Sequence, residues 1–183
     1  EVVTIDPHTL EEVFDSIAEL GVVTGTADSA AALVAGLRAR LDAVAAAVAG
    51  RRQPRVLVLE WTDPPFAPGH WVPQMVTAAG AVSTMGTVGE KSYRTTWDDV
   101  AASAPDIVVS APCGFALPAS LELARGIVSA GVVPEDVPVW AVDANASFAR
   151  PGPRLVDGVE ALAAIAHSDV VGPPDARVAA RVR

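Results

Sequence analysis

The run "VLVLEW", residues 56–61, belongs to the part of the chain that decides the fold. Two further runs share its texture, "DIVVSAP" at 106–112 and "VPVWAVDA" at 137–144. Short, continuous apolar runs rich in valine are typical of strands that are buried on both faces, as in a parallel sheet. We therefore expect three parallel strands, at 56–60, 107–111 and 139–143.

Helical patterns lie between and after these runs, at about 70–79, 97–103, 117–130 and 153–167. Strands that alternate with helices indicate parallel crossovers, in which helices cover both faces of the sheet. The sequence therefore predicts an α/β fold of three layers. The final stretch, "VGPPDARVAARVR", is expected to be a loose tail.

The residues before the first run are mostly helical in pattern. "VVTI" at 2–5 is interpreted as a short strand, and Asp6 with Pro7 is expected to begin a helix that Gly21 ends. A second helix at 29–49 would span roughly 31 Å, which is long for a domain of this size. Its apolar stripe consists of Leu33, Leu37, Leu41, Val44 and Val48.

Composition excludes several classes of function. The net charge is −9 and no basic cluster is long enough to follow phosphates, so nucleic acid is not an expected partner. Cys113 is the one cysteine, so no internal disulfide can form. The opening "EVVTID" lacks the basic start and apolar stretch of a signal peptide, and no apolar run is long enough to suggest a membrane span.

An unusual loop follows each expected strand. These loops are "WTDPPFAPGHW" from residue 61, "APCGFALP" from 111 and "DANASFARPGPR" from 143. Ligands of parallel sheets bind beyond the carboxyl ends of the strands, so all three loops should lie on one rim. Any one of these aromatic rings could simply be core, but three such loops favour a site for a large, partly apolar ligand bound without covalent chemistry.

Other chemistries have weaker support. Cys113 and His70 could form a nucleophilic pair, but no third residue that would orient them is evident. His8, His70 and His167 lie far apart without metal-ligand spacing. "GTVGEKS" at 86–92 resembles a phosphate loop only loosely, because no convincing strand precedes it, and it is interpreted as a surface loop.

Three stretches together resemble a known family: "VLVLEWTDPPFAPGHWVPQMVTAAG", "WDDVAASAPDIVVSAPCGF" and "FARPGPRLVDGVEALAAIAH". They resemble bacterial ABC-transporter substrate-binding proteins of the helical-backbone class, in the branch described as cobalamin-binding or iron-siderophore-binding. The resemblance implies two Rossmann-like lobes joined by one long rigid helix, with the ligand clamped between the lobes. Such proteins bind and deliver a ligand and are not enzymes.

On this resemblance the chain divides into the end of a first lobe (1–27), the backbone helix (28–50), a second ligand-binding lobe (51–172) and a tail (173–183). Most of a first lobe would then precede residue 1, and the chain would carry half a cleft. The apolar side of the first fifty residues would need another cover, for which we expect a homodimer.

The resemblance also implies a set of ligand-binding residues, and it implies no catalytic residue, resident metal or cofactor. The implied ligand-binding residues are Trp61, Asp63, Phe66, His70 and Trp71 in the first loop, Cys113, Gly114 and Phe115 in the second, and Asn145, Phe148 and Arg150 in the third. Tryptophan and phenylalanine suit a flat macrocycle, and arginine and tyrosine are scarce here. A corrinoid such as cobalamin is therefore the favoured ligand, with a ferric siderophore or haem next.

Partner and compartment follow from the same resemblance. A full-length relative would be periplasmic or lipid-anchored at the cell surface and would dock on an ABC-transporter permease, often through a surface glutamate. At one such position this chain has Ala149, just before Arg150, which puts docking there in doubt. A second reading stays open, in which a cytoplasmic corrinoid- or tetrapyrrole-handling protein or enzyme uses the same fold.

Overall fold

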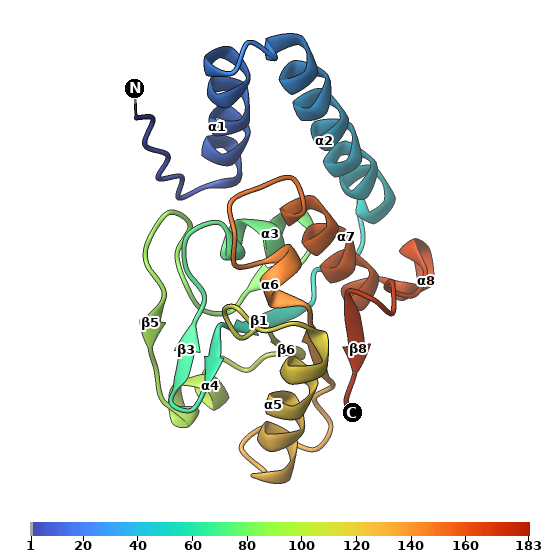
Figure 1. Ribbon diagram of the computed structural model, residues 1–183. Coiled ribbons are helices and arrows are strands. Elements are labelled where there is room, and N and C mark those ends of the chain that lie inside the picture. Colours follow the sequence, from blue (N-terminus) through green and yellow to red (C-terminus); the bar gives the residue numbers. More distant parts are fainter. Residues whose placement is uncertain (1) are drawn as a thin grey trace.

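In the computed structural model, which describes residues 2–183, a five-stranded sheet lies between two layers of helices (Figure 1). The sheet order is β4-β1-β6-β7-β8, and the first four strands run parallel. The three valine-rich runs form its centre, so the predicted α/β fold is confirmed. The strands are β1 (Arg55–Leu59), β4 (Val82–Ser83), β6 (Ile107–Ser110), β7 (Val139–Val142) and β8 (Ala179–Arg181).

Both faces of the sheet are buried, which explains why the strands are apolar throughout. Val56 and Val58 of β1 face α3 (Val72–Ala78) and α7 (Leu155–Ala166), whereas Leu57 and Leu59 face α4 (Trp97–Ala102) and α5 (Leu117–Ser129). All four predicted helices are therefore present. Two short helices, α6 (Ala144–Ser147) and α8 (Ser168–Val171), complete the lobe.

A helical hairpin precedes the sheet and projects from the lobe (Figure 1). Its arms are α1 (Leu10–Val23) and α2 (Ala27–Val48), and α2 is continuous, as the apolar stripe predicted. Leu37 of α2 packs with Phe14 of α1 and Val156 of α7, so a single chain covers most of the stripe. Leu33, near the tip, is the exception at 42% exposed. The expected homodimer therefore has no support here.

The N-terminal segment differs from expectation in two ways. Residues 2–8 form no strand, because a strand needs a partner and no other described strand lies beside them. Helix α1 begins later than Asp6 and Pro7 predicted, because Thr9 caps it in a capping box with Glu12. The helix also continues past Gly21 to Val23.

The final residues are not a loose tail. Strand β8 pairs antiparallel with β7, and Nη2 of Arg183 donates to the carbonyls of Pro134 at 2.6 Å and Val137 at 2.9 Å. The pairing places Ala179 among the buried core residues. Within residues 2–183, no helix combines the length and apolar character needed to cross a membrane.

Candidate functional site

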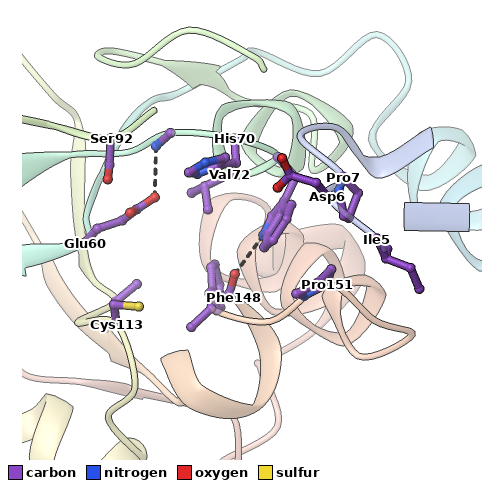
Figure 2. A pocket seen from close by; sticks show the side chains of 14 residues that line it. Ile5, Asp6, Pro7, Glu60, His70, Val72, Ser92, Cys113, Phe148 and Pro151 are labelled. Atoms are coloured by element: carbon purple, nitrogen blue, oxygen red, sulfur yellow. Dashed lines mark hydrogen bonds between the residues drawn. The ribbon is translucent and has the colours of Figure 1, made fainter. Parts of the chain in front are cut away.

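A pocket of about 330 Å³ opens beyond the carboxyl ends of β1, β6 and β7 (Figure 2), which is where ligands of parallel sheets bind. We call it the rim pocket. All three loops identified in the sequence contribute to it. It is lined by Ile5, Asp6, Pro7, Glu60, Gly69, His70, Trp71, Val72, Ser92, Ala111, Cys113, Phe148, Ala149 and Pro151.

The first loop is held rigid by a small sheet of its own. Strands β2 (Trp61–Thr62), β3 (Pro65–Ala67) and β5 (Tyr93–Arg94) pair antiparallel. The carboxylate of Glu60 then closes the base of the loop by accepting the backbone N–H of Gly69 at 2.9 Å. A side chain at Gly69 would lie 2.1 Å from the backbone nitrogen of Ser92, so only glycine fits this approach.

His70 is fixed in an uncommon backbone conformation at the edge of the pocket. Its φ of 50° lies in the left-handed region, which costs a non-glycine residue roughly 1–2 kcal/mol. Two backbone hydrogen bonds to the loop at 86–92 hold it there: His70 donates to Glu90 at 2.6 Å and accepts from Gly89 at 2.9 Å. The "GTVGEKS" segment is therefore more than a surface loop, because it supports the pocket wall.

The N-terminal segment supplies a further wall. Nδ1 of His8 lies 2.9 Å from the carbonyl oxygen of Gly89, and its ring centroid is 5.2 Å from that of His70. The bond to Gly89 and, after it, contact with Asp6 raise the pKa of His8. Ile5, Asp6 and Pro7 line the pocket, so the N-terminal segment builds it together with the three loops.

Two aromatic residues of the pocket also belong to the core. Trp71 is 8% exposed, and its Nε1 donates to the carbonyl of Phe148 at 2.7 Å. Phe148 is itself buried. This bond joins the first loop to the third, and Figure 2 shows its acceptor residue Phe148 at one side of the hollow. Trp71 and Phe148 therefore build the wall and present only small areas to a ligand.

Glu60 is the most unusual ionisable group in the pocket. Burial raises the pKa of its carboxyl, and this effect exceeds the opposing influence of the Gly69 N–H, the Ser92 hydroxyl and His70. A carboxyl that loses solvation without gaining a close cation stays poorly compensated. Glu60 follows directly after β1, and a charged residue at the end of a buried strand was the signal in the sequence that could have found it.

The structure brings only four of the eleven sequence-predicted residues into the rim pocket: His70, Trp71, Cys113 and Phe148. Trp61 and Phe115 pack edge to face nearby, with ring centroids 5.3 Å apart, and Phe115 accepts the backbone N–H of Asn145. The others are not in the lining: Phe66 lies in β3, Asp63 lines a separate hollow, and Gly114 and Arg150 are exposed. Their role in ligand binding stays a prediction.

The structure also locates the residues of the two alternative chemistries, a cysteine–histidine nucleophilic pair and a metal site. Cys113 and His70 line the same pocket, but no hydrogen bond joins the Cys113 thiol to the imidazole in the described chain. Among residues 2–183, no three or more His, Cys, Asp or Glu side chains are grouped so that they could hold a metal ion. His167 is buried elsewhere, with Nε2 3.0 Å from the carbonyl oxygen of Gly80.

Comparison with known proteins places the chain in a family. Solved structures with the same fold include a periplasmic heme binding protein from Pseudomonas aeruginosa (TM-score 0.74, 22% identity, covering 99% of this chain and 67% of that one). They also include an ABC-type Fe3+-hydroxamate transport protein from Saccharomonospora viridis (0.66, 25%, 87% and 57%) and the periplasmic vitamin B12 binding protein of Vibrio cholerae (0.65, 19%, 87% and 62%).

The chain thus spans 57–67% of the length of these three proteins. No curated protein matched it. Residues 1–125 match the family described as periplasmic binding protein, and this match covers more than half of the 183 residues. The chain therefore belongs to the periplasmic binding protein family.

Proposed function

We propose that this chain is the ligand-binding part of the substrate-binding component of an ABC importer, and that it holds a large, partly apolar ligand in the rim pocket without turning it over. The observation that carries the proposal is the position of the pocket. It opens beyond the carboxyl ends of three parallel strands and is lined by loops from each of them. Family membership supports the same function.

The favoured ligand is a corrinoid, followed by a ferric siderophore or haem. Similar structures are described as binding heme or vitamin B12, or as an Fe3+-hydroxamate transport system, which supports a metal chelate as the ligand class. Corrinoids are larger than this hollow, so only one edge of the molecule would enter it. The half-buried pair Trp61 and Phe115, from the first and second loops, lies outside the pocket lining and offers aromatic faces to the remainder.

In its full-length form the protein would act outside the cytoplasm and pass its ligand to a membrane permease. Family membership supports this place and partner, and the alanine at position 149 directs the search for a docking surface to other exposed carboxylates. The chain described here should bind less tightly than a complete two-lobe protein. If the chain keeps half of the binding free energy of a two-lobe protein with nanomolar affinity, its dissociation constant should be roughly 10⁻⁵–10⁻⁴ M.

The direct test is equilibrium dialysis of the chain against cobalamin, haem and a ferric trihydroxamate, each followed by its own absorbance. A Cys113→Tyr variant should lose binding, because Cys113 is exposed and lines the pocket, so the larger side chain would fill the hollow without disturbing the core. Ser129→Tyr, at the exposed end of α5, adds the same side chain away from the pocket and should bind as the parent does.

Two results of this dialysis would contradict the proposal. If none of the three chelates binds at millimolar concentration, the rim pocket is not a chelate site in this chain. If binding is the same in both tyrosine variants, the ligand sits elsewhere on the surface.

A further inference from the structure

The rim pocket has an unusual balance of charge. Among the described residues that line it, two are carboxylates, Asp6 and Glu60, and none is a lysine or arginine. Its remaining ionisable groups are the imidazole of His70 and the thiol of Cys113. The pocket therefore offers hydrogen-bond acceptors and negative charge, with at most one weak cation.

The carboxylate of Glu60 is placed to act on a ligand. It is half-buried, and Figure 2 shows Glu60, His70, Cys113 and Phe148 around the same hollow. The backbone N–H of Gly69 donates to Oε1 at 2.9 Å, but a carboxylate can accept about four hydrogen bonds. Even with the Ser92 hydroxyl as a second donor, Glu60 keeps acceptor capacity in the pocket lining, where low solvation strengthens its interaction with any charge nearby.

Two cationic residues adjoin the lining in sequence without belonging to it. Lys91 and Arg150 are exposed, although Arg150 is flanked by two residues that line the pocket, Ala149 and Pro151. On the N-terminal side, Nε2 of His8 lies 3.6 Å from a carboxylate oxygen of Asp6 and could partly offset that charge when protonated. None of these groups faces Glu60 closely enough to form an ion pair within the described residues.

From this balance we infer that the ligand carries hydrogen-bond donors and no net negative charge. The chemistry that fits is a metal chelate with an amide fringe or a free ammonium group, and ligands with carboxylate or catecholate charge are disfavoured because they would meet Glu60 and Asp6 without a compensating cation. The inference rests on the proposed function and narrows its ligand class by charge.

A charge series on one scaffold tests the inference. Ferrioxamine B, a ferric trihydroxamate with a free ammonium group, is compared with its N-acetyl derivative, which is neutral, and its N-succinyl derivative, which ends in a carboxylate. The dialysis is done at about pH 8, above the ordinary histidine pKa of about 6.5. The cationic form should bind at least about tenfold more tightly than the anionic form. Cyanocobalamin and a monocarboxylate derivative give the same comparison for a corrinoid.

The residue responsible is tested by Glu60→Gln. Glutamine keeps an acceptor for the Gly69 N–H and removes the charge, so the preference for the cationic chelate should shrink several-fold while the neutral chelate changes little. Glu135→Gln is the matched control, because Glu135 is an exposed carboxylate that precedes the amino end of β7, whereas the pocket lies beyond the carboxyl ends of the strands. It should leave the preference unchanged.

Several outcomes would overturn the inference. Tightest binding of the anionic chelate would do so, above all if Arg150→Gln abolished that binding, because the exposed arginine would then supply the missing cation. If the Glu60→Gln variant kept the same preference for the cationic chelate, that result would also contradict the inference. Either result leaves the proposed function standing, whereas a chain that binds no chelate of either series contradicts both.

Discussion

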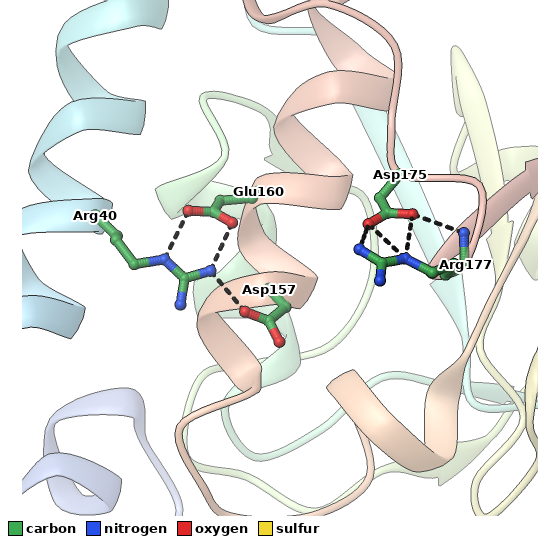
Figure 3. A network of polar contacts seen from close by, with 5 residues as sticks. All are labelled: Arg40, Asp157, Glu160, Asp175 and Arg177. Carbon is green, nitrogen blue, oxygen red and sulfur yellow. Dashed lines mark hydrogen bonds and ion pairs between the residues drawn. The ribbon is translucent and has the colours of Figure 1, made fainter. Parts of the chain in front are cut away.

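Two groups of carboxylates in this molecule differ in what balances them. Between α2 and α7, Asp157 and Glu160 lie against the guanidinium of Arg40, which donates to Glu160 at 2.6 and 2.8 Å and to Asp157 at 2.6 Å (Figure 3). In the rim pocket, Glu60 accepts a backbone N–H, and the described lining holds no lysine or arginine.

The difference separates a structural site from a binding site. Hydrogen bonds to Glu160, and next to Asp157, raise the pKa of Arg40, whereas burial raises the pKa of Glu60. In the first group the fold itself provides the opposite charge, so the carboxylates hold two helices together. In the second group the fold supplies no opposite charge and leaves the Glu60 carboxylate accessible, so that a ligand can supply the charge that balances it.

The largest expected effect tests how far the rim pocket is also part of the core. Trp71→Ala should lower the free energy of unfolding by about 3–5 kcal/mol, because it removes a buried ring and the hydrogen bond to Phe148. Trp61→Ala, in the same loop but half-buried, should cost clearly less. Urea denaturation measures both. Equal losses would mean that Trp71 does not anchor the loops.

Next in size is the loss of the charged contact between α2 and α7. Arg40→Ala should cost roughly 1–2 kcal/mol of unfolding free energy, because Asp157 and Glu160 would be left as neighbouring like charges on one helix face. Arg125→Ala is the control, since Arg125 pairs with Glu122 on the exposed surface of α5 and should cost under about 0.5 kcal/mol. If the two variants are equally stable, the α2–α7 network contributes no more than a surface pair.

A smaller effect on stability tests the backbone conformation of one residue in each region, His70 in the rim pocket and Arg40 in α2. At His70, glycine should give a more stable protein than alanine by about 1 kcal/mol, because the left-handed conformation favours glycine. At Arg40, inside a regular helix, the order should reverse by about 0.5–1 kcal/mol. Thermal unfolding of the four variants gives the ranking. The same order at both positions would show that His70 is not strained.

The smallest effect is seen in carboxyl titrations followed by NMR. Glu60 should titrate above the ordinary glutamate pKa of about 4.3, and Asp175, paired with Arg177 (Figure 3), at about 2. Because folding raises the pKa of Glu60, the folded state binds more protons there, and stability should fall as pH rises from about 4.3 through the raised value. The Asp175 contribution is instead lost as pH falls towards about 2.

Two substitutions check these titrations. Glu60→Gln should remove the decline in stability with rising pH, and Arg177→Gln should return the Asp175 pKa towards its ordinary value. A downward shift at Glu60 would place an unrecognised cation beside it and end the comparison between the two carboxylate groups.

Much of the fold could be predicted because its signals are local. A strand buried on both faces must be apolar along its whole length, so β1, β6 and β7 were evident from the sequence. Strand β8 was missed because "AAR" has little strand propensity, and its conformation comes from pairing with β7. The opposite error occurred at residues 2–5, where strand-forming residues have no other described strand beside them.

The site was predicted in part for the same reason. His70 and Cys113 could be found because they follow strands whose carboxyl ends meet on one rim. Asp6 and Pro7 could not, because only the fold of α1 and the contact between His8 and Gly89 bring them to the pocket. Trp61 packs on Phe115 outside the pocket lining, a placement that depends on the β2–β3 turn, and its contact with a ligand stays a prediction.

The short strands at the two margins of the sheet have a consequence for how the molecule behaves at high concentration. An exposed, long strand edge can recruit another copy through backbone hydrogen bonds and begin aggregation. Here β4 has two residues and β8 has three, and β8 runs antiparallel over the edge of β7. Residues 179–181 therefore shield an apolar four-residue strand, and a protein in which they were detached would present β7 as a template for intermolecular pairing.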